Sequence, residues 1–156
     1  MKVLFDTSVL IAAFIQKHPH HEQAYPWLSK ALKKQIKFYV SNHTLAELFA
    51  VLTKLPVSPS LSPAIARKLI IENVEKHAQF VDLNTKDYLR VLDGMEAAEL
   101  TGGVIYDALI VEAAEKAKVD LLLTFNNKHF QAIWPEGRKK IKVPQYLYIF
   151  SGFFLQ

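Results

Sequence analysis

The 156-residue chain contains no cysteine and only five glycines and two methionines. Without cysteine it cannot form disulfides, thiolate metal sites or a cysteine nucleophile, so it needs no oxidising compartment, and we expect a cytoplasmic protein. Long hydrophobic runs are also scarce, since the most apolar stretch, 146–155, is only about half as long as a membrane-spanning helix. Asp6 interrupts the apolar start of the chain, which argues against a signal peptide. We therefore expect no association with a membrane.

The length and the apolar content of the chain indicate one domain that spans residues 1–156. Apolar residues make up 51% of the sequence, which is enough to build a sizeable core. The formal net charge of +4 slightly favours an anionic partner such as nucleic acid, although many ordinary enzymes are equally basic.

Strand and helix patterns alternate along the chain. Short apolar runs predict strands at 3–5, 37–41, 80–83 and 120–124, with a final edge strand after the basic run 138–142. Helical spacing or capping residues predict helices around 11–15, 24–32, 42–52, 64–76, from 84 onward, around 107–114 and at 128–133. This alternation predicts an α/β fold with a mainly parallel sheet.

Carboxylates follow the first two predicted strands. Asp6, Thr7 and Ser8 come directly after the first strand, at the edge where ligands collect in open α/β sheets. The alternative is that one of these three residues only caps the next helix. Glu47 lies in the helix after the second strand, amid apolar neighbours. It would either meet a cation or hydrogen-bond donor, or simply complement the helix dipole.

Further polar residues lie late in the sequence. Asp107 shares a helix face with apolar residues and should point inward, whereas Glu112 lies around the helix and should be solvated. Thr124 and Asn126 follow the last long strand. A parallel sheet would bring these groups to the same edge as Asp6, where several carboxylates without Lys or Arg between them would repel one another. A divalent cation such as Mg²⁺ or Mn²⁺ would remove that repulsion.

Histidine and basic clusters have weaker patterns. His18, His20 and His21 lie beside a proline turn and lack the spacing of a helix-borne zinc site, so surface positions are the simpler interpretation. The run from Arg138 to Lys142 is typical of a solvated face, but beside a carboxylate site it would hold phosphates.

Four short motifs occur in an order that resembles the PIN domain family, and within it the VapC-type toxins of prokaryotic toxin–antitoxin pairs. They are Asp6-Thr7-Ser8, Ala46-Glu47-Leu48, Asp107-Ala108-Leu109-Ile110, and the stretch from Leu122 through Thr124 and Asn126 to Phe130. The resemblance covers almost the whole chain and implies a three-layer α/β/α fold with a mainly parallel central sheet of about five strands.

The resemblance also implies an activity and a set of site residues. It implies a divalent-metal-dependent endoribonuclease that uses Mg²⁺ or Mn²⁺. The implied metal ligands are Asp6, Glu47 and Asp107, and the implied catalytic set adds Asn126, at a position where many members have aspartate. Supporting hydroxyls would come from Thr7, Ser8 or Thr124. Independently of the resemblance, we expect RNA contacts from the basic residues, which are Lys128, His129, Arg138, Lys139 and Lys140.

The partners implied are an RNA substrate, a cognate antitoxin protein and a second copy of the chain in a homodimer. A dimer would use the face of Trp27, Leu28 and Leu32 or the aromatic tail 146–154, unless both complete the core. Two rival functions remain open. One is a PIN-like module that binds RNA without cutting it, and the other is a metal-dependent phosphatase, although the first strand lacks the second aspartate of a D-x-D motif.

Overall fold

A parallel sheet forms the centre of the molecule. The computed structural model describes residues 1–145, so the aromatic tail named above lies outside the described residues. Within this range the sheet has five strands in the order β3-β2-β1-β4-β5, and each neighbouring pair is parallel. The strands are β1 (Lys2–Phe5), β2 (Lys37–Ser41), β3 (Gln79–Val81), β4 (Leu121–Leu123) and β5 (Ile141–Lys142). The expected parallel α/β architecture is confirmed.

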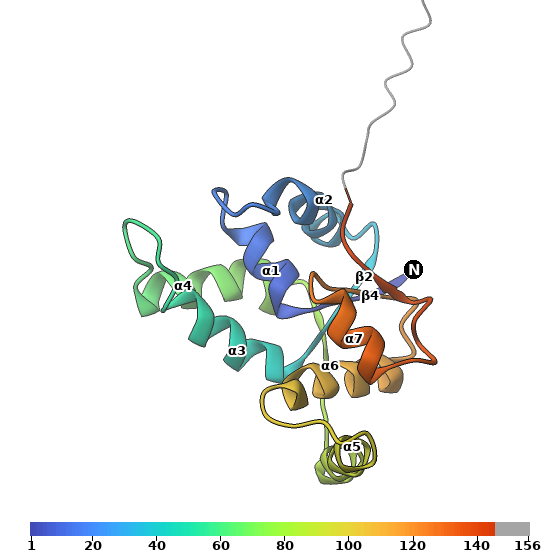
Figure 1. The fold of residues 1–156 in the computed structure, drawn as a ribbon. Coiled ribbons are helices and arrows are strands. Elements are labelled where there is room, and N and C mark those ends of the chain that lie inside the picture. Colours follow the sequence, from blue (N-terminus) through green and yellow to red (C-terminus); the bar gives the residue numbers. More distant parts are fainter. Residues whose placement is uncertain (146–156) are drawn as a thin grey trace, which may run out of the picture.

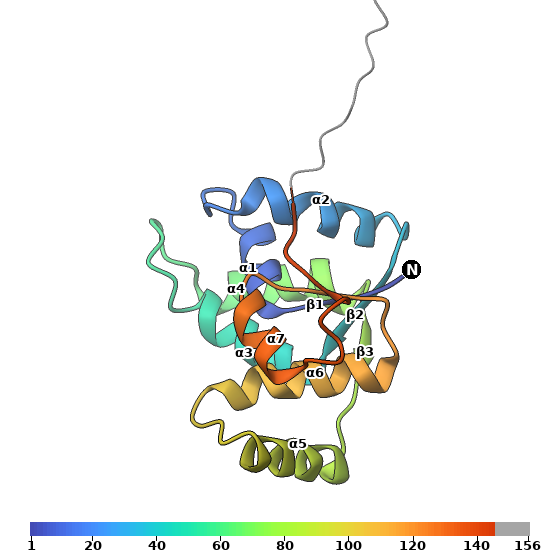
Figure 2. The same ribbon diagram turned by 45° about the vertical axis from the view of Figure 1, so that its right-hand side comes forward.

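Helices cover both faces of the sheet (Figure 1). One face carries α1 (Thr7–Phe14), α2 (His21–Leu32), α3 (Asn42–Leu52), α4 (Pro63–Ile70) and the π-helical turn η1 (Ile71–Glu75). The other face carries α6 (Val104–Ala117) and α7 (Asn127–Ile133). Helix α5 (Thr85–Ala97) packs against α6 on the side away from the sheet, as both views show (Figures 1 and 2).

The side chains of β1 show why the sheet needs both layers. Val3 and Phe5 are fully buried in the core beneath α1, α2 and α3, whereas Leu4 is fully buried in the core beneath α6 and α7. Alternate residues of a strand point to opposite faces, so a strand that is apolar throughout is stable only when both faces are covered.

Three predicted elements differ in detail from the structure. The helix expected over 64–76 is α-helical only to Ile70 and continues as the π-helical turn η1. The strand expected at 80–83 is β3, which begins and ends earlier. The last strand of the described residues, β5, lies inside the basic run, because Ile141 is buried against the core while its neighbour Lys142 stays exposed. The edge strand expected after the run falls largely outside the described residues.

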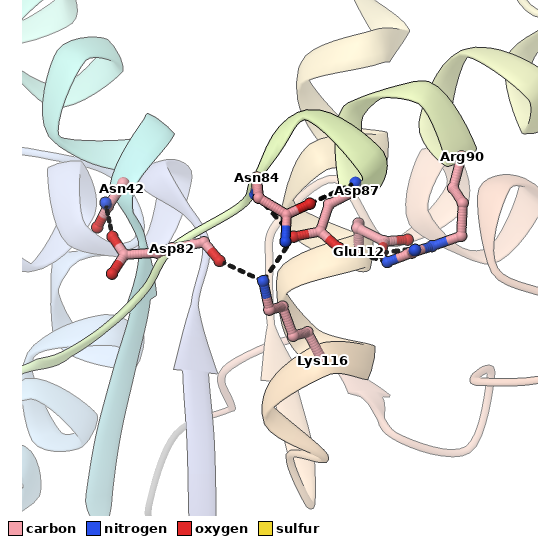
Figure 3. A network of polar contacts seen from close by, with 7 residues as sticks. All are labelled: Asn42, Asp82, Asn84, Asp87, Arg90, Glu112 and Lys116. Carbon is pink, nitrogen blue, oxygen red and sulfur yellow. Dashed lines mark hydrogen bonds and ion pairs between the residues drawn. The ribbon is translucent and has the colours of Figure 1, made fainter.

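A network of charged side chains around the buried Asp87 fastens α5 to α6 (Figure 3). Asp87, only 3% exposed, forms ion pairs with Arg90 and with Lys116, the latter at 2.5 Å. Lys116 and the backbone hydrogen bond at Asn84 lower the pKa of Asp87 to about 2. Glu112 also pairs with Arg90, at 2.6 Å, so the expectation that Glu112 is merely solvated is wrong. Helix α6 is thus held by the sheet on one side and by α5 on the other.

Two further expectations concern surfaces. Leu28 of α2 is buried in the core, and Trp27 and Leu32 are partly buried against it, so much of this apolar face contributes to the core. Its use in a dimer stays a prediction. Among residues 1–145, no helix is both long enough and apolar enough to cross a membrane.

Candidate active site

The polar residues after β1 and β4 meet at the point where the strand order reverses. Strands β1 and β4 are neighbours in the sheet, and the backbone N–H of Asp6 donates to the carbonyl of Leu123 at 2.9 Å. Asp6 and Thr124, 118 positions apart in the sequence, are therefore brought together by strand pairing. Ligands of open α/β sheets bind outside the carboxyl ends of strands at such a reversal.

Two hydroxyl groups hold the Asp6 carboxylate. Ser8 Oγ donates to Asp6 Oδ2 at 2.5 Å, and Thr124 Oγ1 donates to the same oxygen at 2.8 Å. Asp6 is the N-cap residue of α1 by position, but its side chain makes no capping hydrogen bond. The capping interpretation of this carboxylate is therefore wrong.

Asp6 is 3% exposed, and no cation pairs with it among the described residues. Burial raises the pKa of Asp6 to about 6. The nearby Asp107 and Glu47 carboxylates also raise it, while the hydrogen bonds from Ser8 and Thr124 lower it. Desolvation and the neighbouring carboxylates destabilise the ionised form of Asp6, and a bound cation would stabilise it.

The Glu47 side chain is fixed by the residue that follows Asp6. Ser41 caps α3 by accepting a hydrogen bond from the backbone N–H of His43, which starts the helix at the end of β2. Glu47 lies one turn further along α3, and its Oε2 accepts a hydrogen bond from Thr7 Oγ1 at 2.7 Å. The hydroxyl of Thr7 therefore links the first helix to the second carboxylate.

Asp107 lies in the first turn of α6 and is partly buried. Burial and the neighbouring Glu47 raise the pKa of Asp107, whereas His129, whose Nδ1 lies 3.6 Å from Asp107 Oδ2, lowers it. Asn126 precedes α7, where its backbone N–H donates to Thr124 Oγ1 at 2.9 Å. The structure thus brings all four proposed catalytic residues into one region.

These residues line a cleft of about 360 Å³. None of the described residues that line it is Lys or Arg. They are Asp6, Thr7, Ser8, Ile11, His18, His20, Glu47, Val51, Asp107, Phe125 and Asn126. His18, His20 and Phe125 were not predicted as site residues from the sequence. The sequence did contain hints of these residues, namely the histidine cluster before α2 and the position of Phe125 between Thr124 and Asn126. Only the fold shows that the two segments lie together.

The basic residues expected to bind RNA are divided between two places. Lys128 and His129 line a hollow beside the cleft, together with Asn126. Arg138 lines a separate cavity with Trp27 and Gln131. Arg138, Lys139 and Lys140 do not line the carboxylate cleft, because the chain turns away from it after α7 to reach the edge strand β5.

The donor set fits a hard divalent cation in its chemistry, since carboxylate oxygens are the ligands that Mg²⁺ and Mn²⁺ prefer. Within residues 1–145, however, no three histidine or carboxylate side chains are close enough together to form a metal site. The hydroxyls of Thr7, Ser8 and Thr124 instead occupy oxygens of Glu47 and Asp6. The carboxylates face one cleft but do not form a closed set of ligands.

Comparison with known proteins relates the chain to nucleases. A family model described as PIN domain matches residues 3–133. The chain is 32% identical over 116 residues to Ribonuclease VapC27 of Mycobacterium tuberculosis, covering 74% of this chain and 79% of that protein. It is 30% identical over 125 residues to Ribonuclease VapC40 of the same species, covering 75% and 81%.

Solved structures share the fold. VapBC2 of Rickettsia felis, bound to a DNA fragment from its promoter, superposes with a TM-score of 0.64 at 22% identity, covering 92% of this chain and 98% of that one. FitAcB of Neisseria gonorrhoeae gives a TM-score of 0.60 at 16% identity, covering 94% and 99%.

The raised pKa of Asp6 predicts how the stability of the metal-free protein depends on pH. An unfolded aspartate titrates near pH ~3.9, so between pH 4 and about 6 the folded chain binds more protons than the unfolded chain, and stability falls as pH rises. Asp6→Asn removes the buried charge and should raise the free energy of unfolding at pH 7 by about 1–3 kcal/mol. The gain should disappear near pH 4.

Urea denaturation in EDTA at the two pH values measures this difference. Asp93→Asn, at an exposed aspartate of α5, is the matched control and should change stability little at either pH. A destabilised Asp6→Asn protein at pH 7, or a gain that is the same at both pH values, would contradict the prediction.

Proposed function

The chain belongs to the PIN domain family, and from that premise we propose that it is a divalent-metal-dependent endoribonuclease, the toxin of a VapBC-type toxin–antitoxin pair. This proposal rests on three carboxylates that face one cleft, with no Lys or Arg among the described residues that line it. The two relatives reported above are named as VapC ribonucleases, which supports RNA as the substrate.

Asp6, Glu47 and Asp107 would hold Mg²⁺ or Mn²⁺, and Asn126 would contribute a carbonyl oxygen or orient a water molecule. A divalent cation supplies a Lewis acid for the phosphodiester and acidifies a bound water. The hydroxyl of Thr7 orients Glu47, and the hydroxyls of Ser8 and Thr124 orient Asp6. These positioning contacts come from the chain itself, so two of the three carboxylates are held in place before any ligand binds.

Lys128 and His129 would contact RNA phosphates next to the cleft, because they line the adjoining hollow. Arg138, Lys139 and Lys140 would meet the RNA backbone only at a distance from the reacting phosphate, since they do not line the cleft. Phosphate contacts of this kind strengthen binding without selecting a sequence.

A module that binds RNA without cutting it is the second candidate. It is favoured by Asn126, which replaces an acid, and by the lack of a closed metal-ligand group among residues 1–145. Such a module would bind RNA equally well after chelation and after loss of Asp6. A small-molecule phosphatase has no comparable support, because the first strand is followed by one aspartate only.

We expect the purified protein to cleave single-stranded or looped RNA with Mg²⁺ or Mn²⁺ and to stop when EDTA is added. Asp6→Asn and Asp107→Asn each remove a ligand charge with little change in volume, so each should lower the cleavage rate at least ~100-fold, as loss of one electrostatic contact typically does. Asp120→Asn is a matched control, because Asp120 lies at the opposite end of β4 and bonds the backbone of Lys2. Full cleavage by either folded site variant would rule out this assignment.

The asparagine at position 126 should weaken metal binding. With three carboxylates the site should hold one divalent ion well and a second ion only weakly. Asn126→Asp adds a hard anionic ligand and should tighten Mg²⁺ binding and raise cleavage at limiting Mg²⁺. Calorimetric titration and cleavage assays test this, and unchanged affinity together with unchanged activity would place Asn126 outside the metal site.

An antitoxin partner and a homodimer complete the proposal. The solved structures with this fold include a VapBC assembly, which supports a partner protein for this chain. Most of the apolar face of α2 packs against the core. Among the described residues, α5 also carries exposed apolar side chains, because Tyr88, Leu89 and Leu92 are 42%, 53% and 49% exposed.

Co-expression with the neighbouring open reading frame should yield a complex in which RNA cleavage is suppressed, and the chain alone should run as a dimer in light scattering. A monomer at micromolar concentration would contradict the dimer. A neighbouring frame whose product neither binds nor inhibits the chain would indicate a stand-alone ribonuclease.

A further inference from the structure

An aromatic stack lines the same cleft as the carboxylates. The rings of His20 and Phe125 are nearly parallel, with centroids 4.5 Å apart and an angle of 16° between the planes. Phe125 is the inner ring, because it is half-buried and packs against the core beneath α1. His20 is the outer ring, because it is exposed. One ring of the pair is thus supported by the core while the other faces solvent at the cleft.

The outer ring is held in position by its own loop. The backbone N–H of His20 donates to His18 Nδ1 at 3.1 Å, and His20 Nδ1 lies 2.9 Å from Gln23 Oε1. The backbone N–H of Phe125 donates to Ser8 Oγ at 3.1 Å, and Ser8 in turn donates to Asp6. The stack is therefore connected to the catalytic carboxylate through one hydroxyl group.

A second stack of the same type lies near Glu47 and Asp107. The rings of His43 and Tyr106 are 4.9 Å apart with an angle of 7° between the planes. Tyr106 directly precedes Asp107 and is 49% exposed, whereas His43 is half-buried and lies one helical turn before Glu47. The first stack joins the segment before α2 to the loop after β4, and both of its rings line the cleft. The second joins α3 to α6 and lies next to two of the cleft carboxylates in the chain without lining the cleft itself.

We infer that the two stacks are platforms for unpaired nucleobases near the scissile phosphate, the first inside the cleft and the second beside Glu47 and Asp107. The cleft offers no Lys or Arg among its described lining residues, so the side chains nearest the carboxylates provide little charge for holding RNA. Flat rings supply the missing attraction, because every base can stack on an aromatic face regardless of its identity. This inference rests on the proposed endoribonuclease function and narrows its substrate to RNA whose flanking bases are unstacked.

The consequence for substrate choice is direct. A base within a duplex is already stacked on its neighbours and cannot lie against a protein ring without being unpaired first. Cleavage should therefore fall on loops, bulges and single strands, and the two stacks should affect binding of RNA more than the chemical step.

A thermodynamic cycle between ring and base tests the inference. Binding of an unstructured 12-nucleotide RNA is measured in Mg²⁺ with the Asp6→Asn protein, and the RNA is scanned with one abasic nucleotide at a time. Loss of the stacked base should weaken binding about 5-fold or more, the effect of one base–aromatic contact. In protein that also carries His20→Ala, the same abasic nucleotide should weaken binding no further, because the ring on which the base stacks is gone. In protein that carries His20→Phe, the abasic nucleotide should weaken binding as it does in the parent. At a second RNA position, Tyr106→Ala should likewise abolish the effect of the abasic nucleotide, and Tyr106→Phe should retain it.

Two variants serve as controls. His77→Ala and Tyr25→Ala remove a histidine and an exposed tyrosine that belong to neither stack, and each should leave the abasic scan unchanged. The inference is overturned if RNA does not bind, if no abasic position weakens binding, or if the abasic loss is as large in His20→Ala and Tyr106→Ala as in their parent. Cleavage by the otherwise unaltered chain is measured separately. If the abasic effect depends on the rings but no RNA is cleaved, the proposed nuclease function is rejected while the stacking platforms are supported.

Discussion

A buried carboxylate held by two hydroxyl groups is the constraint around which the site is built. Asp6 directly follows β1, next to the end of β4. Its partners Ser8 and Thr124 come from the segments that follow these two strands. Such a charge is costly in a protein interior unless its surroundings compensate for it. The same hydroxyls also accept hydrogen bonds from the backbone of Phe125 and Asn126, which fixes the loop that forms one wall of the cleft.

The other carboxylates depend on helices that are anchored elsewhere. Asp107 stands at the start of α6, whose far half is tied to α5 by Glu112 and Lys116. These ion pairs lie outside the sheet, yet they restrict the rotation of the helix that carries Asp107. Glu47 is restrained by Thr7 rather than by its own helix. The position of Asp107 therefore depends on the packing of α6 against the sheet and on its ion pairs with α5, whereas the position of Glu47 depends on its hydrogen bond with Thr7.

Much of the fold was predictable because its signals are local. Apolar runs such as 3–5 depend only on neighbours in the chain, and the strand predicted there is confirmed. The role of Glu112 was not predictable, because Arg90 belongs to another helix. The cleft positions of His20 and Phe125 were missed for the same reason, since these residues are 105 positions apart and meet only in the folded chain. The polar residues at strand ends predicted which side chains would form the site, whereas contacts between distant helices determine how those side chains are arranged.

The distance along the chain between Asp6 and Thr124 has a consequence for synthesis. A nascent chain that has reached the end of β3 already carries Asp6 and Glu47, but it lacks Asp107, Thr124 and strand β4. Because β4 is the neighbour of β1 in the sheet and the segment after it supplies one of the hydroxyls that hold Asp6, the cleft cannot be completed before Thr124 has left the ribosome. The proposed RNA-cutting centre therefore stays unassembled while all the earlier residues of the domain are being synthesised.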